Sequence, residues 1–447
     1  MTVLSPQIAT LERVQPMRIT GRVAALKGLT VLVEELPLPA GSLVSVHGET
    51  EESLGEVVGF TRDQAIVMLL GRAVGIREGA RVVGLQTSQS APVGPRLLGR
   101  VVDGIGRPID GLGPVLETEA RPLIPAPLNA MDRRRITEPL LSGVRVIDLM
   151  TTLGRGQRIG IFAGPGVGKS TLLGTIARSS SADVNVIALI GERGREVGDF
   201  LAHSLDPEGL KRSVVVVATS DEAPLLRIRA ALVACAAAEH FRDHGRDVLL
   251  MMDSVTRFAH AQRQVGLSVG EPPATKGYTP SVFAMLPLLL ERAGTTERGS
   301  ITGLYTILVE GDDMTEPIAD AARGVLDGHI ILSRRLAQRA YYPALDPLDS
   351  VSRVAEDVCD QAHTAARRQI IRLLAAYRDV EDLVQIGAYA PGSNPEADTA
   401  IEYRPRIIDL LCQGKGDRAG YDEARSVMIK IAMEAGDALQ RRLQKAR

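Results

Sequence analysis

The spacing of hydrophobic residues changes twice along the 447-residue chain. From about Met17 to Leu85, short β-prone runs such as TVLVEEL and LVSVHG are separated by glycines at turn-like intervals. Short strands with frequent turn residues predict a small all-β barrel or sandwich. Between Gly94 and Pro139 glycine and proline dominate, which predicts connecting loops that wrap the next domain.

After Gly143, continuous apolar runs alternate with stretches of helical periodicity. The runs are RIGIFA, VNVIALIG, SVVVVATS, DVLLMMDS, ITGLYTILVEG and HIILS. Apolar strands without alternation indicate a parallel sheet that helices cover on both faces. The segment from Glu222 to His244 has apolar residues at helical spacing and is predicted to be one of these helices. From about Ser350 the helical period continues without strand-like runs, so a helical domain is expected to follow.

Composition narrows the possible partners. Lysine plus arginine (52 residues) nearly balance aspartate plus glutamate (54), so the net charge is -2 and no bulk field attracts nucleic acid or anionic lipid. The absence of tryptophan and an aromatic content of 3% also disfavour an RNA helicase, because few stacking platforms are present. No apolar run approaches the ~20 residues that span a bilayer, so a membrane role is expected to come through partners.

A phosphate-binding loop is the strongest chemical signal. The string AGPGVGKST, from Ala163 to Thr171, follows the predicted strand RIGIFA and precedes the helical LLGTIARS, which is the order such a loop requires. Its glycines let successive backbone N–H groups and the helix N-terminus point at phosphates. Lys169 is expected to contact the terminal phosphates of ATP, and Ser170 to ligate Mg²⁺. The chain departs from the strict phosphate-binding pattern at its first position, where the pattern has glycine and this sequence has Ala163. The predicted nucleotide contacts are Gly164, Pro165, Gly166, Val167, Gly168, Lys169, Ser170 and Thr171.

Two acidic residues follow other predicted strands. Asp253 ends the run VLLMMD, and a carboxylate there can hold Mg²⁺ beside the loop; alternatively, it is the polar residue at which a buried strand reaches solvent. Glu192, in GERGREV after VNVIALI, is the candidate base for the attacking water. A salt bridge with Arg193, Arg195 or Arg212 explains Glu192 equally well.

The chain resembles the hexameric ATPases of type III export, most closely those of flagella, over about residues 18 to 435. Injectisome ATPases and the catalytic subunit of rotary ATP synthases are relatives of that family. The stretches that carry the resemblance are IFAGPGVGKSTLL, IGERGREV, VVVVATSDEAPLLR, VLLMMDSVTRFAHAQRQVGLSVGEPPATKGYTPSVF, EPIADAARGVLDGHIIL, YPALDPLDSVSR and QIGAYAPGSNPEAD.

The resemblance implies an α/β P-loop NTPase with a RecA-like parallel sheet, an N-terminal all-β barrel domain and a C-terminal helical domain. We place the barrel at residues 18–92, the ATPase domain at 93–350 and the helical domain at 351–447. Residues 1–17 are expected to bind a stator-like regulatory subunit. Ser5 and Pro6 form a good helix start there, although a frayed terminus is an equal alternative.

The resemblance also implies a homohexamer with ATP between subunits. Arg353, in SVSR, matches the arginine finger that reaches the neighbouring site, and Tyr342, in YYPALDP, matches the residue that stacks on adenine; an ordinary half-buried tyrosine is the alternative. The other implied partners are a central stalk protein, export chaperones and substrates, and the membrane export gate. The implied location is the cytoplasm, at the inner-membrane export apparatus.

We therefore predict an enzyme that hydrolyses ATP to drive chaperone release, unfolding and delivery of flagellar export substrates. The alternatives are a virulence-type secretion ATPase, a rotary catalytic subunit and an inactive ring component. Retention of Lys169, Glu192, Asp253 and Arg353 together argues against the last of these.

Overall fold

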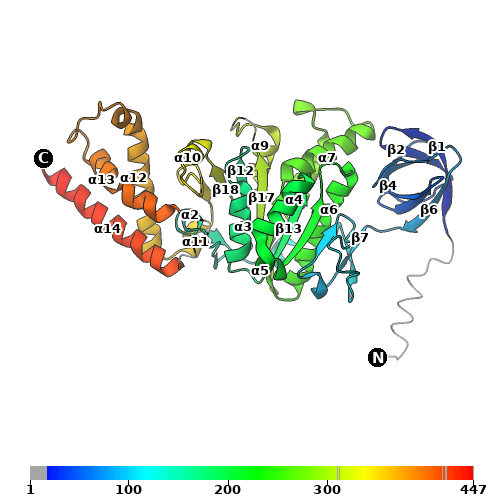
Figure 1. The fold of residues 1–447 in the computed structure, drawn as a ribbon, viewed down its shortest axis with the longest axis horizontal. Helices are drawn as coiled ribbons and strands as arrows, with labels where there is room; N and C mark the ends of the chain where they lie inside the picture. Colours follow the sequence, from blue (N-terminus) through cyan, green and yellow to red (C-terminus); the bar gives the residue numbers. More distant parts are fainter. Residues whose placement is uncertain (1–17, 310, 312, 415, 418–419, 446–447) are drawn as a thin grey trace, which may run out of the picture.

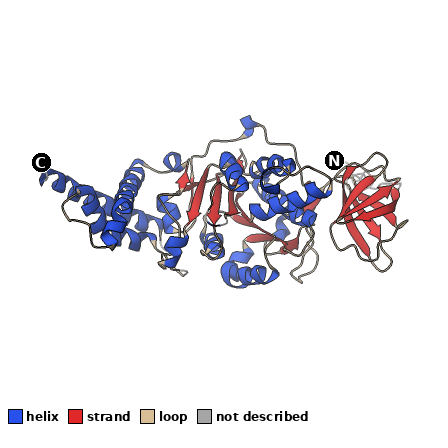
Figure 2. Cartoon of the chain, turned by 90° about the horizontal axis from the view of Figure 1, so that it is seen from above, coloured by secondary structure: helices blue, strands red, loops and turns tan. Residues whose placement is uncertain are grey.

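Three structural units follow one another along the long axis of the molecule (Figure 1). The computed structural model describes residues 18–309, 311, 313–414, 416–417 and 420–445. A strand barrel lies at one end, a helix-covered sheet in the middle and a group of helices at the other end, as Figure 2 also shows. This architecture confirms the predicted fold class. The partner-binding helix expected within residues 1–17 lies outside the described residues.

The N-terminal unit is a closed antiparallel barrel with the strand order β1-β2-β5-β4-β3-β6. Valines from all six strands fill it, as their β-branched side chains suit a pleated, half-buried surface. Strand β5 alternates between two cores, because Val67 and Leu69 face the barrel interior while Met68 and Leu70 join the core of the central unit. The strands are β1 (Thr20–Lys27), β2 (Thr30–Glu34), β3 (Leu43–His47), β4 (Glu52–Phe60), β5 (Ala65–Leu69) and β6 (Arg81–Gln86).

The connection to the central unit contains more structure than its glycines and prolines indicate. Strand β7 (Ser90–Val93) pairs with β9 (Glu119–Pro122), and β8 (Val101–Asp103) joins the edge of the central sheet beside β14. The prediction of loops alone between Gly94 and Pro139 is therefore wrong, because strands this short leave no readable periodicity. The segment also holds η1 (Pro95–Leu97), η2 (Ala130–Asp132) and β10 (Pro139–Leu140), which pairs with β11 (Leu153–Gly154).

The central unit is built on a sheet with the strand order β19-β18-β12-β17-β15-β13-β14-β8. All neighbours in this order are parallel except β19, which runs antiparallel to β18, and the short β16 (Gly294–Thr295) pairs antiparallel with β17. The six predicted apolar strands are confirmed: β12 (Arg158–Ala163), β13 (Val184–Ile190), β14 (Ser213–Ala218), β15 (Asp247–Asp253), β17 (Ser300–Leu308) and β18 (Gly328–Leu332), followed by β19 (Val351–Ser352).

Helices cover both faces of this sheet. In β13, Val186 and Ala188 pack into one core while Ile187 and Leu189 pack into the other. The predicted helix between Glu222 and His244 is α6, and nearly every one of its residues is buried. One face carries α6 (Pro224–Asp243), α7 (Val255–Ser268), α8 (Pro280–Leu290) and α9 (Pro317–Val325), and the other α2 (Arg145–Met150), α3 (Lys169–Ser179) and η3 (Phe200–Leu205). The short α4 (Gly194–Asp199), α5 (Asp206–Lys211) and η4 (Thr275–Gly277) lie in connections.

The last unit is helical, as predicted. Its helices are α12 (Gln361–Gln385), α13 (Pro395–Leu411) and α14 (Tyr421–Lys445), preceded by the short α10 (Arg334–Gln338) and α11 (Ala355–Val358). Asp360 caps α12 and Asn394 caps α13, each accepting hydrogen bonds from first-turn N–H groups. Across the described ranges, none of the helices is both long and apolar enough to cross a membrane.

A buried ion pair joins the barrel to the central unit. Arg229 on α6 donates from Nη1 to Oε2 of Glu56 on β4 over 2.6 Å, and the two side chains are only 3% and 5% exposed. Gln89 donates a further hydrogen bond to Glu56. Burial raises the pKa of Glu56, and Arg229 opposes that rise. The ion pair therefore stabilises the contact between the barrel and the central unit only while both charged partners are present.

We expect Glu56→Leu or Arg229→Met to destabilise the attachment of the barrel by roughly 3–5 kcal/mol. Each substitution leaves one charged group buried without its partner. The double variant should recover a large part of this loss, since no charge stays buried. Hydrogen exchange of barrel amides would measure both effects. Replacing Glu434, whose pair with Arg406 is partly exposed, is the control and should change little. A double variant as unstable as the worse single variant would contradict this account.

Candidate functional site

Four neighbouring strands bring the predicted site together at one edge of the sheet. In the order β12, β17, β15 and β13, these strands place Lys169 after the first, Thr306 within the second, Asp253 at the end of the third and Glu192 after the fourth. Because the strands are parallel, their carboxyl ends meet at the same edge. Residues up to 137 positions apart in the sequence thus become neighbours.

The loop between β12 and α3 has the backbone of a phosphate cradle. Gly166 and Gly168 have φ angles of 80° and 92°, a region that favours glycine. Gly168 is the N-cap of α3, and no side chain caps this end. The first N–H groups of α3 therefore remain available to an anion, which the positive end of the helix dipole also favours. Ser170 is exposed on the first turn.

A largely desolvated ammonium group, on a side chain that is 14% exposed, lies among carboxylates at the base of this loop. Lys169 Nζ contacts Oδ1 of Asp253 and lies 3.5 Å from Oε1 of Glu192. Burial lowers the pKa of Lys169, but the two carboxylates outweigh this and hold the pKa above its usual value. Thr306 donates from Oγ1 to the same Asp253 oxygen over 2.7 Å. Asp253 is 4% exposed, so it is not a residue at which the strand reaches solvent.

The structure excludes the three salt bridges considered for Glu192. The three arginines considered as its partners bind elsewhere: Arg193 pairs with Glu196, Arg195 pairs with Asp199, and Arg212 donates to the backbone oxygens of Ser180 and Ala182. The cation beside Glu192 is Lys169.

Glu192 holds its proton unusually tightly. Burial raises its pKa to about 7; the charge of Asp253 and a hydrogen bond with Glu196 add to the rise, while Lys169 and Arg257 oppose it. The same hydrogen bond lowers the pKa of Glu196, so the proton of the pair resides on Glu192. A carboxyl group that titrates near neutral pH is suited to accept a proton from water.

Three residues of this cluster escaped the sequence analysis. Thr306 is a lone hydroxyl inside an apolar run, a position that gives no chemical signal by itself. Glu196 lies four positions after Glu192, a helical spacing that offered a usable hint. Arg257 packs against the backbone at Gly191, where a Cβ added to the glycine would lie 2.9 Å from the Cβ of Arg257. The positive charge of Arg257 lowers the pKa of Glu192.

Tyr342 lies beside the loop. A Cβ placed on Gly168 would be 3.7 Å from Cε1 of Tyr342, and the tyrosine remains 46% exposed. Its carbonyl oxygen accepts a hydrogen bond from the backbone N–H of Gln413 over 2.8 Å, which fixes it between the central and helical units. An exposed aromatic face at the mouth of a phosphate cradle can receive a flat ring.

Arg353 is the predicted site residue that the fold keeps apart. It is exposed, and its N–H donates to the backbone oxygen of Asp327 over 3.0 Å. Strand β19 pairs Ser352 with Gly328 at the start of β18, so Arg353 lies at the amino ends of the strands. Lys169 lies at their carboxyl ends. Arg353 therefore belongs to the edge of the sheet opposite the loop of its own chain.

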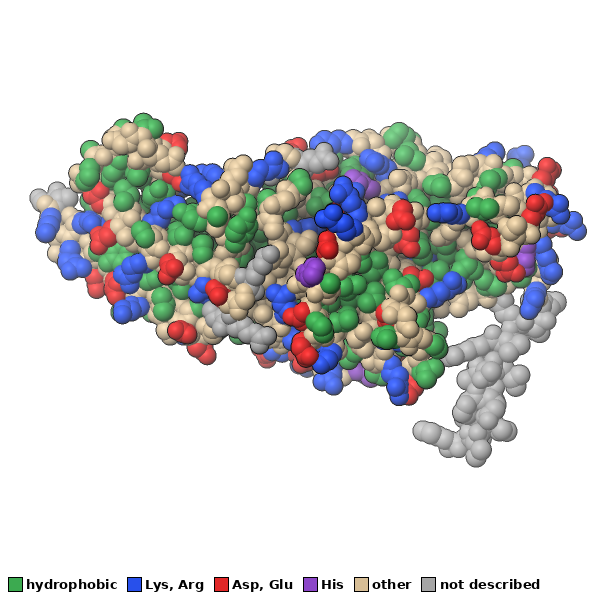
Figure 3. Space-filling view, viewed as in Figure 1, with side chains coloured by type: hydrophobic (Ala, Val, Ile, Leu, Met, Phe, Trp, Pro, Cys, Tyr) green, Lys and Arg blue, Asp and Glu red, His purple; other side chains and the backbone are tan. Residues whose placement is uncertain are grey.

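The surface around these elements carries mixed charge. On the face shown in Figure 3, acidic and basic side chains are interspersed over all three units. This distribution fits the near-zero net charge.

Two family models match the chain. The nucleotide-binding domain of the ATP synthase alpha/beta family matches residues 143–352, and the C-terminal domain of the type III secretion ATPase EscN matches residues 359–430.

Individual relatives extend the match over most of the sequence. The flagellum-specific ATP synthase of Treponema pallidum is 50% identical over 415 residues, which cover 92% of this chain and 93% of that protein. The type 3 secretion system ATPase of Xanthomonas euvesicatoria is 47% identical over 436 residues, with 97% and 98% coverage. The assembled ATPase EscN of enteropathogenic E. coli, solved with its central stalk EscO, has a TM-score of 0.86 at 42% identity and covers 92% of this chain and 100% of that one. The chain therefore belongs to the flagellum-specific and type III secretion ATPases, a branch of the ATP synthase alpha/beta family.

Proposed function

We propose that this chain is the ATPase of a flagellar protein export apparatus. The observation that carries the proposal is the cluster of Lys169, Asp253 and Glu192 under an uncapped helix N-terminus. The identity of 50% to a flagellum-specific relative supports the flagellar assignment. A virulence-type secretion ATPase is the second candidate, since a relative of that name is 47% identical. The match of the C-terminal helices to a type III secretion model argues against a rotary catalytic subunit.

In this proposal the loop from Gly164 to Thr171 holds the phosphates of ATP. The terminal phosphates compete with Asp253 and Glu192 for the ammonium group of Lys169, which is already positioned below the loop. The backbone N–H groups at the start of α3 bind the remaining phosphate oxygens. Tyr342 receives the adenine ring against one edge of the loop.

The donor set fits a magnesium ion. Mg²⁺ prefers oxygen ligands, and Asp253 offers a carboxylate whose Oδ1 is held by Thr306 and Lys169, while Ser170 offers an exposed hydroxyl nearby along the chain. Ser170 and Asp253 would hold the ion, the latter through water. When bound, it would neutralise charge on the phosphates.

Glu192 is the proposed general base. It accepts a proton from the water that attacks the terminal phosphate, and Lys169 stabilises the negative charge on the transferred group. Burial, Asp253 and Glu196 favour the protonated form of Glu192, so the residue is tuned to exchange a proton near neutral pH.

The position of Arg353 supports a ring of identical subunits. A finger arginine at the sheet edge opposite its own loop cannot serve that loop, whereas it can face the loop of a neighbour. We propose a homohexamer in which each interface joins the Lys169 side of one subunit to the Arg353 side of the next. The assembled EscN relative, solved with its central stalk, makes a comparable ring and stalk reasonable here.

The remaining partners follow from the proposed role. Residues 1–17 would bind a stator-like regulatory subunit, and the helical unit would face the membrane export gate. Export chaperones and their substrates are the cargo, at the cytoplasmic side of the inner membrane. We keep 18–92, 93–350 and 351–447 as the proposed domains.

Glu192 should make the ATPase rate fall on the acid side of neutral pH, which gives the pH–rate profile an acid limb. Because its pKa is raised to about 7, the base is protonated below that pH, and kcat/KM should fall about tenfold per pH unit on the acid side. Glu192→Gln should abolish turnover. Glu196→Gln replaces the charged acceptor of the hydrogen bond that raises this pKa with a neutral amide, which weakens the bond and should shift the limb to lower pH. Steady-state rates between pH 5.5 and about 8.5 test this; a limb unmoved by Glu196→Gln would count against the assignment.

Mixing two inactive variants tests the shared site. Lys169→Ala and Arg353→Ala should each lose about a thousandfold in rate, because one loses the phosphate ligand and the other the finger. In random hexamers of an equal mixture, about a quarter of the interfaces combine an intact loop with an intact finger, so activity should reappear. Each variant alone at the same total concentration is the control. If mixing restores nothing, Arg353 does not act on a neighbour.

Tyr342 should affect nucleotide binding more than turnover. Tyr342→Ala is expected to raise the KM for ATP about tenfold, equivalent to roughly 1–3 kcal/mol of stacking, with kcat nearly unchanged. Tyr342→Phe keeps the ring and serves as the matched control. Equal KM values for the alanine and phenylalanine variants would show that the ring of Tyr342 does not stack on adenine.

A further inference from the structure

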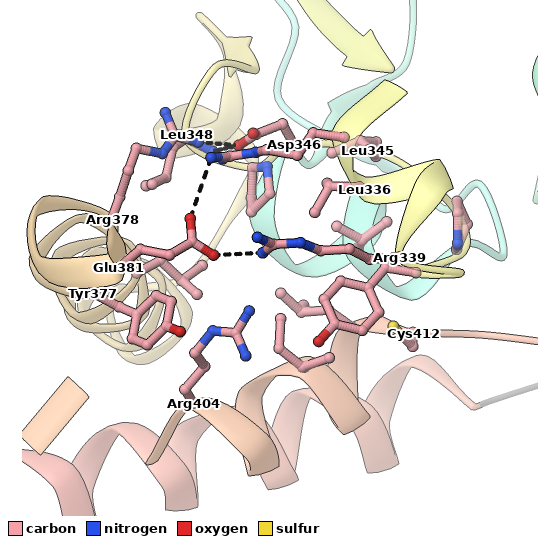
Figure 4. Close-up of a pocket in the computed structure, with 18 residues that line it drawn as sticks. Leu336, Arg339, Leu345, Asp346, Leu348, Tyr377, Arg378, Glu381, Arg404 and Cys412 are labelled. Atoms are coloured by element: carbon pink, nitrogen blue, oxygen red, sulfur yellow. Dashed lines mark hydrogen bonds and ion pairs between the residues drawn. The ribbon is translucent and has the colours of Figure 1, made fainter. Parts of the chain in front are cut away.

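A second cleft lies between α10, α12 and α13, at the junction of the central and helical units (Figure 4). Apolar side chains form half of its lining: Val146, Leu336, Pro343, Leu345, Pro347, Leu348, Leu374, Ile408 and Leu411. Cys412 and a set of charged and aromatic side chains complete it: Arg335, Arg339, Arg378, Arg404, Asp346, Glu381, Tyr341 and Tyr377. None of these residues belongs to the cluster around Lys169.

The carboxylates of this cleft are already occupied. Glu381 accepts from Arg335 over 3.2 Å and from Arg339, and Asp346 accepts from Arg378 over 2.6 Å. With four arginines and two carboxylates, the lining has more positive than negative charge. Burial would raise the pKa of Glu381, but Arg339, Arg335 and Arg404 hold it below its usual value, so Glu381 is ionised and the surplus is real.

Arg404 carries one of the two surplus positive charges; the other lies on Arg335 and Arg339, which share Glu381. Within the described part of the chain Arg404 forms no ion pair with a carboxylate; instead its guanidinium lies over the ring of Tyr377 at 4.2 Å, with the ring of Tyr341 at 5.9 Å. Figure 4 shows Arg404 directed into the cleft beside Tyr377. Because Tyr377 covers one face of the guanidinium, the N–H groups along its edge remain for an acceptor.

We propose that this cleft binds a small amphipathic anion. The apolar body of the ligand lies against the leucines, and its carboxylate or phosphate accepts hydrogen bonds from Arg404. Charge complementarity supports an anion as the ligand, because Arg404 has no carboxylate partner in the lining and an anion would balance its charge. The proposal goes beyond ATP hydrolysis and does not depend on it.

Such a ligand would act on the nucleotide site. Tyr341 and Pro343 line the cleft, while Tyr342 between them lies against Gly168 of the phosphate loop. A ligand that moves this three-residue segment changes the position of Tyr342. Coupling of this kind is reciprocal, so a bound nucleotide must change the affinity of the cleft in turn.

Fluorescence titration of the full chain with 1-naphthyl phosphate and 1-naphthoate tests the proposal. The chain contains no tryptophan, so the emission of the naphthyl group is measured against a low protein background. We expect saturable binding of at least one anion, and the comparison of the two decides between phosphate and carboxylate. The uncharged 1-naphthol should bind about tenfold more weakly, because it cannot pair with Arg404.

Variants locate the site. Arg404→Gln should weaken binding about tenfold, and Arg404→Lys should retain part of the affinity, whereas Arg406→Gln, on the same helix but paired with Glu434, should not change it. Lys169→Ala should bind the probe as the wild type does, which separates the cleft from the phosphate loop. Saturating ADP should change the affinity of the wild type for the probe.

Absence of binding by both anions would overturn the proposal, as would equal affinity of the Arg404→Gln and wild-type chains when both unfold at the same temperature. An affinity that ADP leaves unchanged would overturn the coupling. Because binding is measured without turnover, the probe and variant results do not depend on the proposed ATPase role; only the ADP result rests on nucleotide binding at the phosphate loop.

Discussion

The desolvation of one ammonium group organises the centre of this protein. The side chain of Lys169 is only 14% exposed, and a largely desolvated cation persists only where negative charge and hydrogen-bond acceptors surround it. The parallel sheet supplies that environment, because the carboxyl ends of its central strands place Asp253 and Glu192 around one point. Thr306 holds Asp253 from β17, the strand between β12 and β15. Burial and the charge of Asp253 raise the pKa of Glu192 at the same point, while Lys169 opposes the rise.

The same sheet gives the subunit two chemically different edges. The carboxyl ends of the strands carry donor groups that can bind an anion, and the amino ends carry the exposed Arg353. A head-to-tail contact between copies brings unlike edges together, which is the geometry that closes a ring. Tyr342 adds a third connection, since its backbone is bonded to Gln413 of the helical unit while its ring lies at the loop.

Much of this could be predicted from sequence because the decisive signals are local. Continuous apolar runs identify buried parallel strands, and the spacing of GPGVGKS identifies the loop. Strand β8 was missed because three residues carry no period. Thr306 and Arg404 were missed because their importance arises from partners distant in sequence, Asp253 in one case and Tyr377 in the other. The opposition of Arg353 and Lys169 likewise depends on strand direction, which the residues alone do not reveal.

Strand β5 shows how the barrel relates mechanically to the rest. Its alternate side chains belong to the barrel core and to the core of the central unit, and Glu56 on the next strand is bonded to α6. Buried side chains connect the two units along this strand, so we expect the barrel to move with α6 rather than to hinge about β5. In the proposed hexamer, six such barrels would form a stiff collar against which the opposite ends of the subunits can move.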